Sequence, residues 1–500
     1  MSQYCYSPLS PGANTIRLLR LMPHAKESIE ETELQCELFE YSLQDLGRRT
    51  HLYEALSYTW GGEKKPCSIM IKEQKLDITL NLYAALLHLR DRSLTRIMWI
   101  DAICIDQENK EEQSQQVKLM AMIYSKASRV LVWLGETVDM EGALEDIRRA
   151  ANEVSAERSH KNINEKAIVR LLQQGWFQRI WVLQEVAAAR HIVMMCGSTE
   201  IDGYAFCLGL KSLQKSQKLS YAATPELQAL PSLTDLIEQA SLRPKHITGS
   251  PVMYSLGIRS LAELVDMFHT RQASDPRDKV YALLGMSSDD ASKASFQPDY
   301  KISWEEVFQQ LVKFILSKDV FVETSSYRAV IKSKGCILGR VSSVRRDDRQ
   351  IVNIISKKAT WDLGGKTEWT FQASANPIQK HDIICLLHGS SKPTIIRLCK
   401  DHFAIVVIAA TPLNGNSSFE WPEPSQSITQ CLRDFRLVWD LKTPLEEWQD
   451  QEYKALTKIH GQALEYSKTD FGDYFNEATR LWNDIMILDD IGEYENAEDR

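Results

Sequence analysis

The chain has 500 residues, of which 44% are hydrophobic and 25% are charged, and its formal net charge is −8. This composition is typical of a soluble globular protein, and the length allows roughly two to four domains with sizeable cores. The negative net charge argues against binding of nucleic acid through phosphate neutralisation.

The cysteines and the apolar runs predict a reduced protein without a membrane span. The ten cysteines include no C-x-x-C pair and no Cys/His cluster at zinc spacing, so we expect buried thiols and no metal site. Apolar stretches such as 403–412 have about ten residues, which is too short to cross a bilayer. The first residues lack a charged head followed by an apolar run, so we expect no secretory signal and a cytoplasmic location.

The first 200 residues alternate between strand and helix patterns. Residues 1–50 are expected to form a lead-in with a short hairpin. Strands are then expected at 53–58, 97–105, 130–134 and 191–196, and helices at 80–90, 111–127, 142–158, 164–174 and 176–189. The alternation predicts an α/β domain over residues 51–204, in which a parallel sheet carries helices on both faces.

The pattern changes after this α/β domain. Residues 205–330 are expected to be mainly helical, and they include a charged turn at 271–278 that leads into a helix ended by Gly285. Short strands and turns predict a small β domain at 335–412. Residues 427–500 are expected to form an acidic helical tail.

Polar residues and glycines follow the first two predicted strands, at the sheet edge where open α/β folds bind ligands. Ser57, Tyr58, Trp60 and Gly61 end the first strand, and Asp106 ends the second. A serine hydroxyl can hydrogen-bond a ribose or phosphate, an indole can stack on a base, and glycine allows close backbone approach. Alternatively, these side chains close the strand and cover a core.

Asp101 is a carboxylate inside the otherwise apolar second strand. A buried carboxylate needs a partner or a function. Arg179 is one candidate partner, which would make a buried ion pair. A ligand-binding role for Asp101 is the alternative.

The segment Arg179–Glu185 predicts a helix on which Trp181 and Glu185 lie one turn apart on one face, with Gln184 elsewhere on the same helix. A glutamate beside an aromatic ring in an apolar helix can have a raised pKa and act as a general base or a ribose ligand. A solvated glutamate at the helix edge is the alternative.

Common motifs of nucleotide-binding and hydrolytic enzymes are missing. The sequence contains no G-x-x-x-x-G-K-[ST] phosphate loop, no G-x-G-x-x-G fingerprint, no G-x-S-x-G elbow and no H-E-x-x-H zinc motif. Kinase, P-loop NTPase, serine hydrolase and zinc-enzyme activities are therefore not predicted.

Three segments together resemble the fungal heterokaryon incompatibility (HET) domain, whose patterns are Y-x-A-L-S-Y-x-W-G, W-I-D-x-x-C-I-D-Q and R-x-W-x-x-Q-E. The matching residues are Tyr53, Ala55, Leu56, Ser57, Tyr58, Trp60 and Gly61; Trp99, Ile100, Asp101, Cys104, Ile105, Asp106 and Gln107; and Arg179, Trp181, Gln184 and Glu185. The resemblance covers roughly residues 50–200 and includes the segment 116–136. Weaker similarity continues into Asp275–Asp278 and the small β domain.

The resemblance implies a role in fungal non-self recognition and regulated cell death. HET domains are also remotely similar to TIR domains, which have a flavodoxin-like sheet and in many cases cleave NAD. The TIR catalytic glutamate lies in a W-C-x-x-E stretch, and Trp181 and Glu185 have the same spacing, with Val182 in place of the cysteine. By this similarity Glu185 would be catalytic and NAD would be a substrate rather than a cofactor.

The same resemblance assigns the surrounding residues. Seven residues would line the pocket, and Arg179 and Gln184 would be structural. The pocket residues are Ser57, Tyr58, Trp60, Gly61, Asp101, Asp106 and Trp181.

The resemblance also leaves alternatives. The domain would otherwise be a non-catalytic module that forms homo-oligomers or binds a death-pathway partner, with a separate sensor protein as trigger. A third alternative is a biosynthetic-cluster or stress protein that carries the domain.

Overall fold

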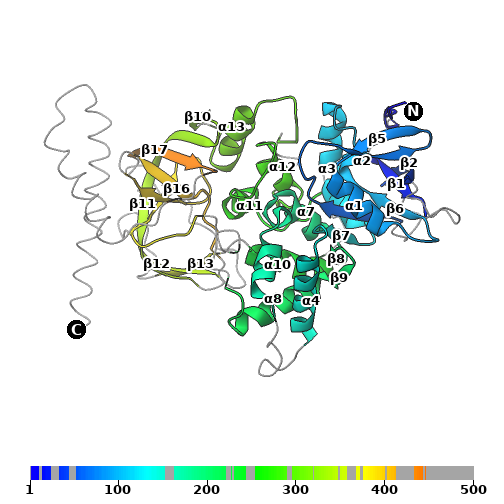
Figure 1. The fold of residues 1–500 in the computed structure, drawn as a ribbon. Helices are drawn as coiled ribbons and strands as arrows, with labels where there is room; N and C mark the ends of the chain where they lie inside the picture. Colours follow the sequence, from blue (N-terminus) through cyan, green and yellow to red (C-terminus); the bar gives the residue numbers. More distant parts are fainter. Residues whose placement is uncertain are drawn as a thin grey trace. The chain divides into compact units, whose positions relative to one another are not determined.

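The computed structural model describes residues 2–10, 14–23, 33–43, 52–152, 163–220, 227, 230–243, 254–289, 296–318, 320–346, 349–356, 367–371, 376–399, 402–412, 433–442 and 445. The chain divides into two compact units. Unit 1 consists of residues 1–258 and 271–301, and unit 2 consists of residues 259–270 and 302–500. Figure 1 shows the elements of both units.

Unit 1 contains a nine-stranded sheet in the order β5-β4-β2-β1-β6-β3-β7-β8-β9. Its strands are β1 (Thr15–Leu21), β2 (Gln35–Ser42), β3 (Glu54–Tyr58), β4 (Cys67–Ile71), β5 (Gln74–Ile78), β6 (Arg96–Trp99), β7 (Val130–Trp133), β8 (Ile192–Cys196) and β9 (Thr199–Asp202). β6, β3, β7 and β8 are parallel. The strand pairs β1–β2, β4–β5 and β8–β9 are antiparallel, so the sheet is mixed rather than parallel as predicted.

The parallel strands form the buried centre of unit 1. All residues of β7 and β8 are buried, as expected for strands covered on both faces. The lead-in strands β1 and β2 extend this sheet, since β1 pairs with β6. The α/β class predicted from the strand and helix patterns is confirmed, whereas the sheet is mixed and not parallel throughout.

The described helices of unit 1 lie between and after the strands of this sheet. They are α1 (Leu80–Leu89), α2 (Asp101–Cys104), α3 (Lys110–Lys126), α4 (Val138–Asn152), α5 (Glu165–Leu172), α6 (Gly175–Gln178), α7 (Trp181–Ala188), α8 (Gly203–Lys215), α10 (Leu230–Glu238), the short η3 (Ala240–Leu242) and α12 (Asp278–Leu284). Side chains of Thr79, Asn109, Asn164 and Asp202 accept hydrogen bonds from the first-turn amides of α1, α3, α5 and α8.

Two predicted elements are interrupted at polar residues. The strand expected at 97–105 ends at Trp99, and Asp101 begins the short helix α2. The helix expected at 176–189 breaks at Arg179, which has extended backbone and bridges to Gln272. Backbone pairing with a segment distant in sequence overrides the local helical pattern there.

In the order β6-β3-β7-β8 the sheet is extended first on one side of β3 and then on the other, so the strand order reverses at β3. After β3 the chain moves to β6 on one side, and after β6 it crosses to β7 on the other side. Ligands of open α/β sheets bind beyond the carboxyl ends of the strands at such a point. Ser57 and Tyr58, the last residues of β3, lie at this edge.

Residues 271–301 return to unit 1 and pack α12 against α7. A Cβ atom at Gly285 would lie 2.6 Å from the Gln184 side chain, which is too close for any side chain. Gln184 is buried, and with its amide oriented to satisfy both groups it donates to the Ala282 carbonyl and accepts from the Ala121 amide. Gln184 therefore ties α7 to α3 and α12, in line with a structural role.

Unit 2 holds the helices α11 (Leu261–Phe268) and α13 (Trp304–Ile315) and a second sheet. Its strands are β10 (Phe321–Ser325), β11 (Arg328–Arg346), β12 (Gln350–Ser356), β13 (Thr367–Phe371), β14 (Ile383–Leu387), β15 (Thr394–Leu398), β16 (Phe403–Val407) and β17 (Arg433–Asp440). The long β11 pairs with both β14 and β17, so the pairings β11-β14-β15-β16-β17-β11 form a closed ring.

This sheet changes two of the predicted boundaries. It begins at Phe321, inside the region 205–330 that was expected to be helical, and extends beyond the predicted 335–412. The prediction of helix over 427–500 is wrong at β17, where Phe435, Leu437 and Trp439 alternate inward onto the sheet. Apart from 433–442 and 445, that predicted tail lies outside the described residues.

Candidate functional site

The centre of the candidate site is Glu185 on α7. The Ser57 hydroxyl donates a short hydrogen bond to Glu185 Oε2 and accepts one from Trp176 Nε1 at 2.8 Å. Only 2% of Glu185 is exposed, and Ser57 and Trp176 are buried as well. The structure therefore joins the first and third sequence segments through one buried carboxylate.

Burial controls the ionisation of Glu185. Loss of hydration raises its pKa from 4.5 to about 7, although Arg179 and the Ser57 hydrogen bond both favour the charged form. The charge of Asp101 adds to the increase. Glu185 is therefore balanced between its neutral and charged forms near neutral pH.

Arg179 is the cation of the site, and it is only partly buried. Its guanidinium donates to the Tyr58 carbonyl, and in the described part of the chain it has no carboxylate within the 4.0 Å of an ion pair. Its charge nevertheless lowers the pKa values of Asp101, Glu185 and Asp278. Arg179 therefore interacts electrostatically with three carboxylates. The ion pair between Asp101 and Arg179 that the sequence suggested is not formed.

Trp60 and Asp101 form the more open side of the site, and Tyr58 is buried beside them. Asp101 Oδ2 accepts from Trp60 Nε1 at 2.9 Å, and its Oδ1 accepts from the Ala102 amide at 2.8 Å. Trp60 is 36% exposed. Burial and the nearby Asp101 raise the pKa of the Tyr58 hydroxyl, which makes no hydrogen bond of normal geometry to the described residues.

Asp278 is a site residue that the sequence motifs missed. Its carboxylate accepts from the Tyr300 hydroxyl at 2.5 Å, and its helix packs against α7, which begins at the partly buried Trp181. Burial raises the pKa of Asp278 to about 6. The sequence signal was the charged turn before Gly285, but nothing in it connected that turn to α7.

Asp106 and Gly61 are placed differently from the rest of the predicted pocket. Asp106 Oδ1 accepts from the Glu108 amide at 3.2 Å, and its own amide donates to Glu112. Gly61 is exposed with φ +79°, a backbone conformation that favours glycine. Neither makes a hydrogen bond or ion pair with Glu185 in the described structure, so their predicted ligand roles stay predictions.

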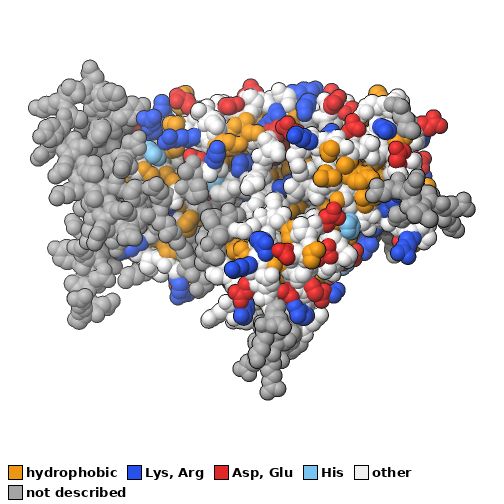
Figure 2. Space-filling model, viewed as in Figure 1, with side chains coloured by type: hydrophobic (Ala, Val, Ile, Leu, Met, Phe, Trp, Pro, Cys, Tyr) orange, Lys and Arg blue, Asp and Glu red, His pale blue; other side chains and the backbone are white. Residues whose placement is uncertain are grey.

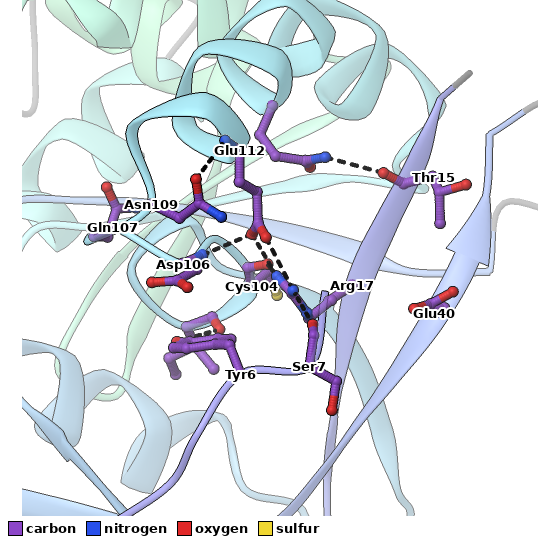
Figure 3. A network of polar contacts seen from close by, with 12 residues as sticks. Tyr6, Ser7, Thr15, Arg17, Glu40, Cys104, Asp106, Gln107, Asn109 and Glu112 are labelled. Carbon is purple, nitrogen blue, oxygen red and sulfur yellow. Dashed lines mark hydrogen bonds and ion pairs between the residues drawn. The ribbon is translucent and has the colours of Figure 1, made fainter. Parts of the chain in front are cut away.

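Glu112 and Arg17 form a second buried cluster of charged residues, next to the W-I-D-x-x-C-I-D-Q segment (Figure 3). Arg17 donates to both carboxylate oxygens of Glu112, at 2.5 and 3.0 Å, and to the carbonyls of Ser7 and Cys104. Its guanidinium also lies 5.0 Å from the centre of the Tyr6 ring. This cluster holds the N-terminal segment, β1 and α3 together.

The described residues offer no metal site, because they contain no group of three or more His, Cys, Asp or Glu side chains arranged to bind an ion. No described helix is long and apolar enough to cross a membrane.

Unit 1 is thus a mixed α/β unit with an acidic, partly buried site at the carboxyl edge of its parallel strands. Residues 53–185 match the family model described as "Heterokaryon incompatibility protein (HET)", which supports the presence of a HET domain in unit 1.

The chain is also similar to "Heterokaryon incompatibility protein 6, OR allele" of Neurospora crassa, with 26% identity over 388 residues. The alignment covers 62% of this chain and 53% of that protein, so the chain matches about half of the relative's length. No solved structure gives a significant match.

Proposed function

We propose that this chain acts in fungal non-self recognition and regulated cell death by hydrolysing NAD at Glu185. The observation that carries the proposal is the buried Glu185 carboxylate. It accepts a hydrogen bond from Ser57 and lies near Arg179, which forms no ion pair in the described structure. Perturbed ionisable groups gathered at a sheet edge are typical of active sites. The role in non-self recognition rests on the HET match and on the name of the Neurospora relative.

The charge of the site suits this substrate. Three carboxylates, Asp101, Glu185 and Asp278, interact with the single cation Arg179, so the site is negative when they are ionised. The nicotinamide ring of NAD carries a positive charge, and this charge moves to the ribose as the glycosidic bond breaks. Fixed negative charge near the developing cation lowers the barrier.

The reaction breaks the bond between the nicotinamide nitrogen and C1′ of the ribose. The bonding electron pair leaves with nicotinamide, and C1′ becomes an oxocarbenium-like centre. Ionised Glu185 stabilises this centre, water adds to C1′, and a proton is released with ADP-ribose and nicotinamide. The partly exposed Trp60 indole supplies a stacking surface for the substrate.

The topology supports a TIR-like reading of unit 1. The parallel strands follow the order second-first-third-fourth, which is the flavodoxin-like order. Ser57 and Tyr58 end the first of these strands, where this topology places its ligand site. Location in the cytoplasm and activation by self-assembly or by a separate sensor protein are part of the proposal.

The non-catalytic alternative is favoured by two observations. Glu185 is only 2% exposed and is satisfied by Ser57, as in a packing network. Leu80 and Leu87 on α1 are 64% and 42% exposed, and Figure 2 shows hydrophobic side chains gathered over this helix. Exposed apolar side chains of this kind are typical of interaction surfaces.

NAD consumption by the purified full chain tests the proposal, with wild type beside Glu185→Gln and Glu111→Gln. Glu111 is an exposed carboxylate of the same unit, paired with Lys301, so its variant controls for loss of charge alone. We expect Glu185→Gln to lower kcat by at least about 100-fold and Glu111→Gln to match wild type.

The proposal fails if Glu185→Gln keeps wild-type turnover. It also fails if no protein consumes NAD at high concentration and if NAD does not raise the melting temperature of wild type. Self-association or partner binding that is lost on Leu80→Ser and Leu87→Ser would then support the non-catalytic module.

A further inference from the structure

Trp176 and Glu185 meet at one hydroxyl group, that of Ser57, although they lie on two different short helices. Trp176 belongs to α6 and Glu185 to α7, and the backbone between these helices is extended at Arg179. In one continuous helix, residues nine positions apart point about 180° away from each other, so their side chains could not reach the same group. The break at Arg179 therefore makes the contact of both side chains with Ser57 possible.

The break between α6 and α7 is held by two residues that lie outside the part of the chain matched by the family model. The Gln272 amide donates to the Gln178 carbonyl at 2.8 Å, and the Ile180 amide donates to the Gln272 carbonyl at 2.9 Å. Arg271 Nη1 donates to the Phe177 carbonyl at 2.5 Å. The relative placement of α6 and α7 is therefore fixed by a segment that is distant in sequence.

The chemistry of the indole group fixes the direction of the hydrogen bonds at Ser57. Trp176 Nε1 carries a hydrogen and cannot accept, so at 2.8 Å from Ser57 Oγ it is the donor. The Ser57 proton is then directed to its other polar neighbour, Oε2 of Glu185. All three side chains are buried, and a donor to Oγ strengthens the hydrogen bond that the hydroxyl itself donates.

The other carboxylate oxygen of Glu185, Oε1, accepts no hydrogen bond from the described residues. The Trp176 ring is held in place by Phe177, against which it packs edge-on with the ring centres 5.0 Å apart. One oxygen of the carboxylate is thus held by a fixed chain of donors, and the other is left for a further partner.

We propose that Trp176 is a positioning residue, which directs the Ser57 hydroxyl onto Oε2 of Glu185 and so holds the carboxylate with Oε1 left for the ribose of the substrate. The inference rests on the proposed function for its substrate. It adds a hydrogen-bond chain from Trp176 through Ser57 to Glu185. This chain favours the ionised carboxylate, which is the form that stabilises the oxocarbenium-like centre.

Other ionisable groups also affect the carboxylate at the end of this chain. Arg179 and Asp101 interact with it electrostatically. The phenols of Tyr58 and Tyr124 do so as well, and burial raises the pKa values of both above 10. Asp278, on the helix α12 that packs against α7, has a pKa of about 6. Because Asp101 and Asp278 can contribute to a pH profile of activity, the titration of the carboxylate itself has to be measured.

Carbon-13 NMR of the full chain labelled with [δ-13C]glutamate follows this titration without any need for activity, and the Glu185 signal is the one missing from Glu185→Gln. We expect Ser57→Ala to raise the midpoint by about 1 pH unit, because a hydrogen bond to a charged group is lost, and Trp176→Phe to raise it by about 0.5 pH unit. Trp133→Phe is the matched control and should leave the midpoint unchanged. Trp133 is as buried as Trp176, and it donates to Asn81 Oδ1 at 3.0 Å.

A double-mutant cycle tests whether Trp176 acts through Ser57. If it does, Trp176→Phe moves the midpoint little further in a Ser57→Ala background. Equal rises in both backgrounds would overturn the inference, as would an unmoved midpoint in either single variant. A merely structural defect would lower the fraction of folded protein without moving the midpoint.

NAD turnover reports the same hydrogen-bond chain during the reaction. Because ionised Glu185 is the active form and its pKa is about 7, kcat of Trp176→Phe should lie about threefold below wild type at pH 6 and equal it at pH 9. The same loss at both pH values contradicts the positioning role. A wild-type chain that consumes no NAD, with a midpoint that still rises in Trp176→Phe, would reject the proposed function and retain the hydrogen-bond chain.

Discussion

Unit 1 contains two buried glutamates, Glu112 and Glu185, whose carboxylates both accept hydrogen bonds. Glu112 forms an ion pair with an arginine, whereas Glu185 does not in the described structure. Glu112 faces Arg17 in a two-point ion pair and also accepts the Asp106 amide. Among the described residues Glu185 accepts a hydrogen bond only from Ser57, and Arg179, the cation that acts on it, also acts on Asp101 and Asp278. Both glutamates are less than 10% exposed, at 7% and 2%.

The comparison shows that burial alone does not indicate function. A buried charge with a matched partner is satisfied, and removing the partner is costly. A buried carboxylate without one has its pKa raised and is ready to exchange protons or to stabilise a cation. The Glu112 cluster is therefore a structural clamp, and the Glu185 cluster is the candidate active site.

Loss of the Glu112 partner should have the largest effect. Arg17→Met leaves Glu112 buried without its cation, and we expect the free energy of unfolding to fall by about 3–5 kcal/mol. Urea unfolding followed by circular dichroism measures this change. Arg20→Met is the matched control on the same strand, because the Arg20–Glu37 pair is more than a third exposed and should cost less than about 1 kcal/mol. Equal losses in the two variants would contradict the comparison.

Glu185→Gln should raise the free energy of unfolding relative to wild type, and this gain should increase with pH. Replacement of a satisfied carboxylate has the opposite effect. The folded pKa of Glu185, about 7, lies above its ordinary value of 4.5, so ionisation opposes folding as pH rises through this range. Glutamine removes this penalty. We expect the variant to be more stable than wild type by about 3 kcal/mol at pH 8, and by about 1 kcal/mol at pH 5.

Urea unfolding at both pH values checks this prediction, with Glu111→Gln as the control that should show no pH-dependent gain. A Glu185→Gln variant that is less stable than wild type at pH 8 would mean that Glu185 is a satisfied structural charge like Glu112.

The smallest effect concerns the helix that carries Glu112. The Asn109 side chain accepts from the amides of Glu111 and Glu112 at 3.1 and 3.2 Å at the start of α3. Asn109→Ala should lower the free energy of unfolding by about 1 kcal/mol. NAD turnover per folded molecule should stay at the wild-type level, because the cap supports the clamp rather than the site; a large loss of turnover would link the two clusters.

The sequence by itself determined the local elements of unit 1 and the segments that carry the site. Continuous apolar runs marked β3, β7 and β8 because parallel strands are buried on both faces, and that pattern is local. The spacing of Trp181 and Glu185 likewise followed from helical geometry. Ser57, Glu185 and Asp101 were named as candidates from such patterns, and the structure places all three at one sheet edge.

Tertiary structure alone decided which charges are matched. Arg17 and Glu112 are 95 residues apart in the chain, and α12, which carries Asp278, packs against α7 although it follows residues assigned to unit 2. The break at Arg179 follows from its bridge to Gln272 and overrides a helical pattern. The β17 strand forms because it completes a ring of strands. Each result depends on a partner distant in sequence, and local periodicity contains no information about such partners.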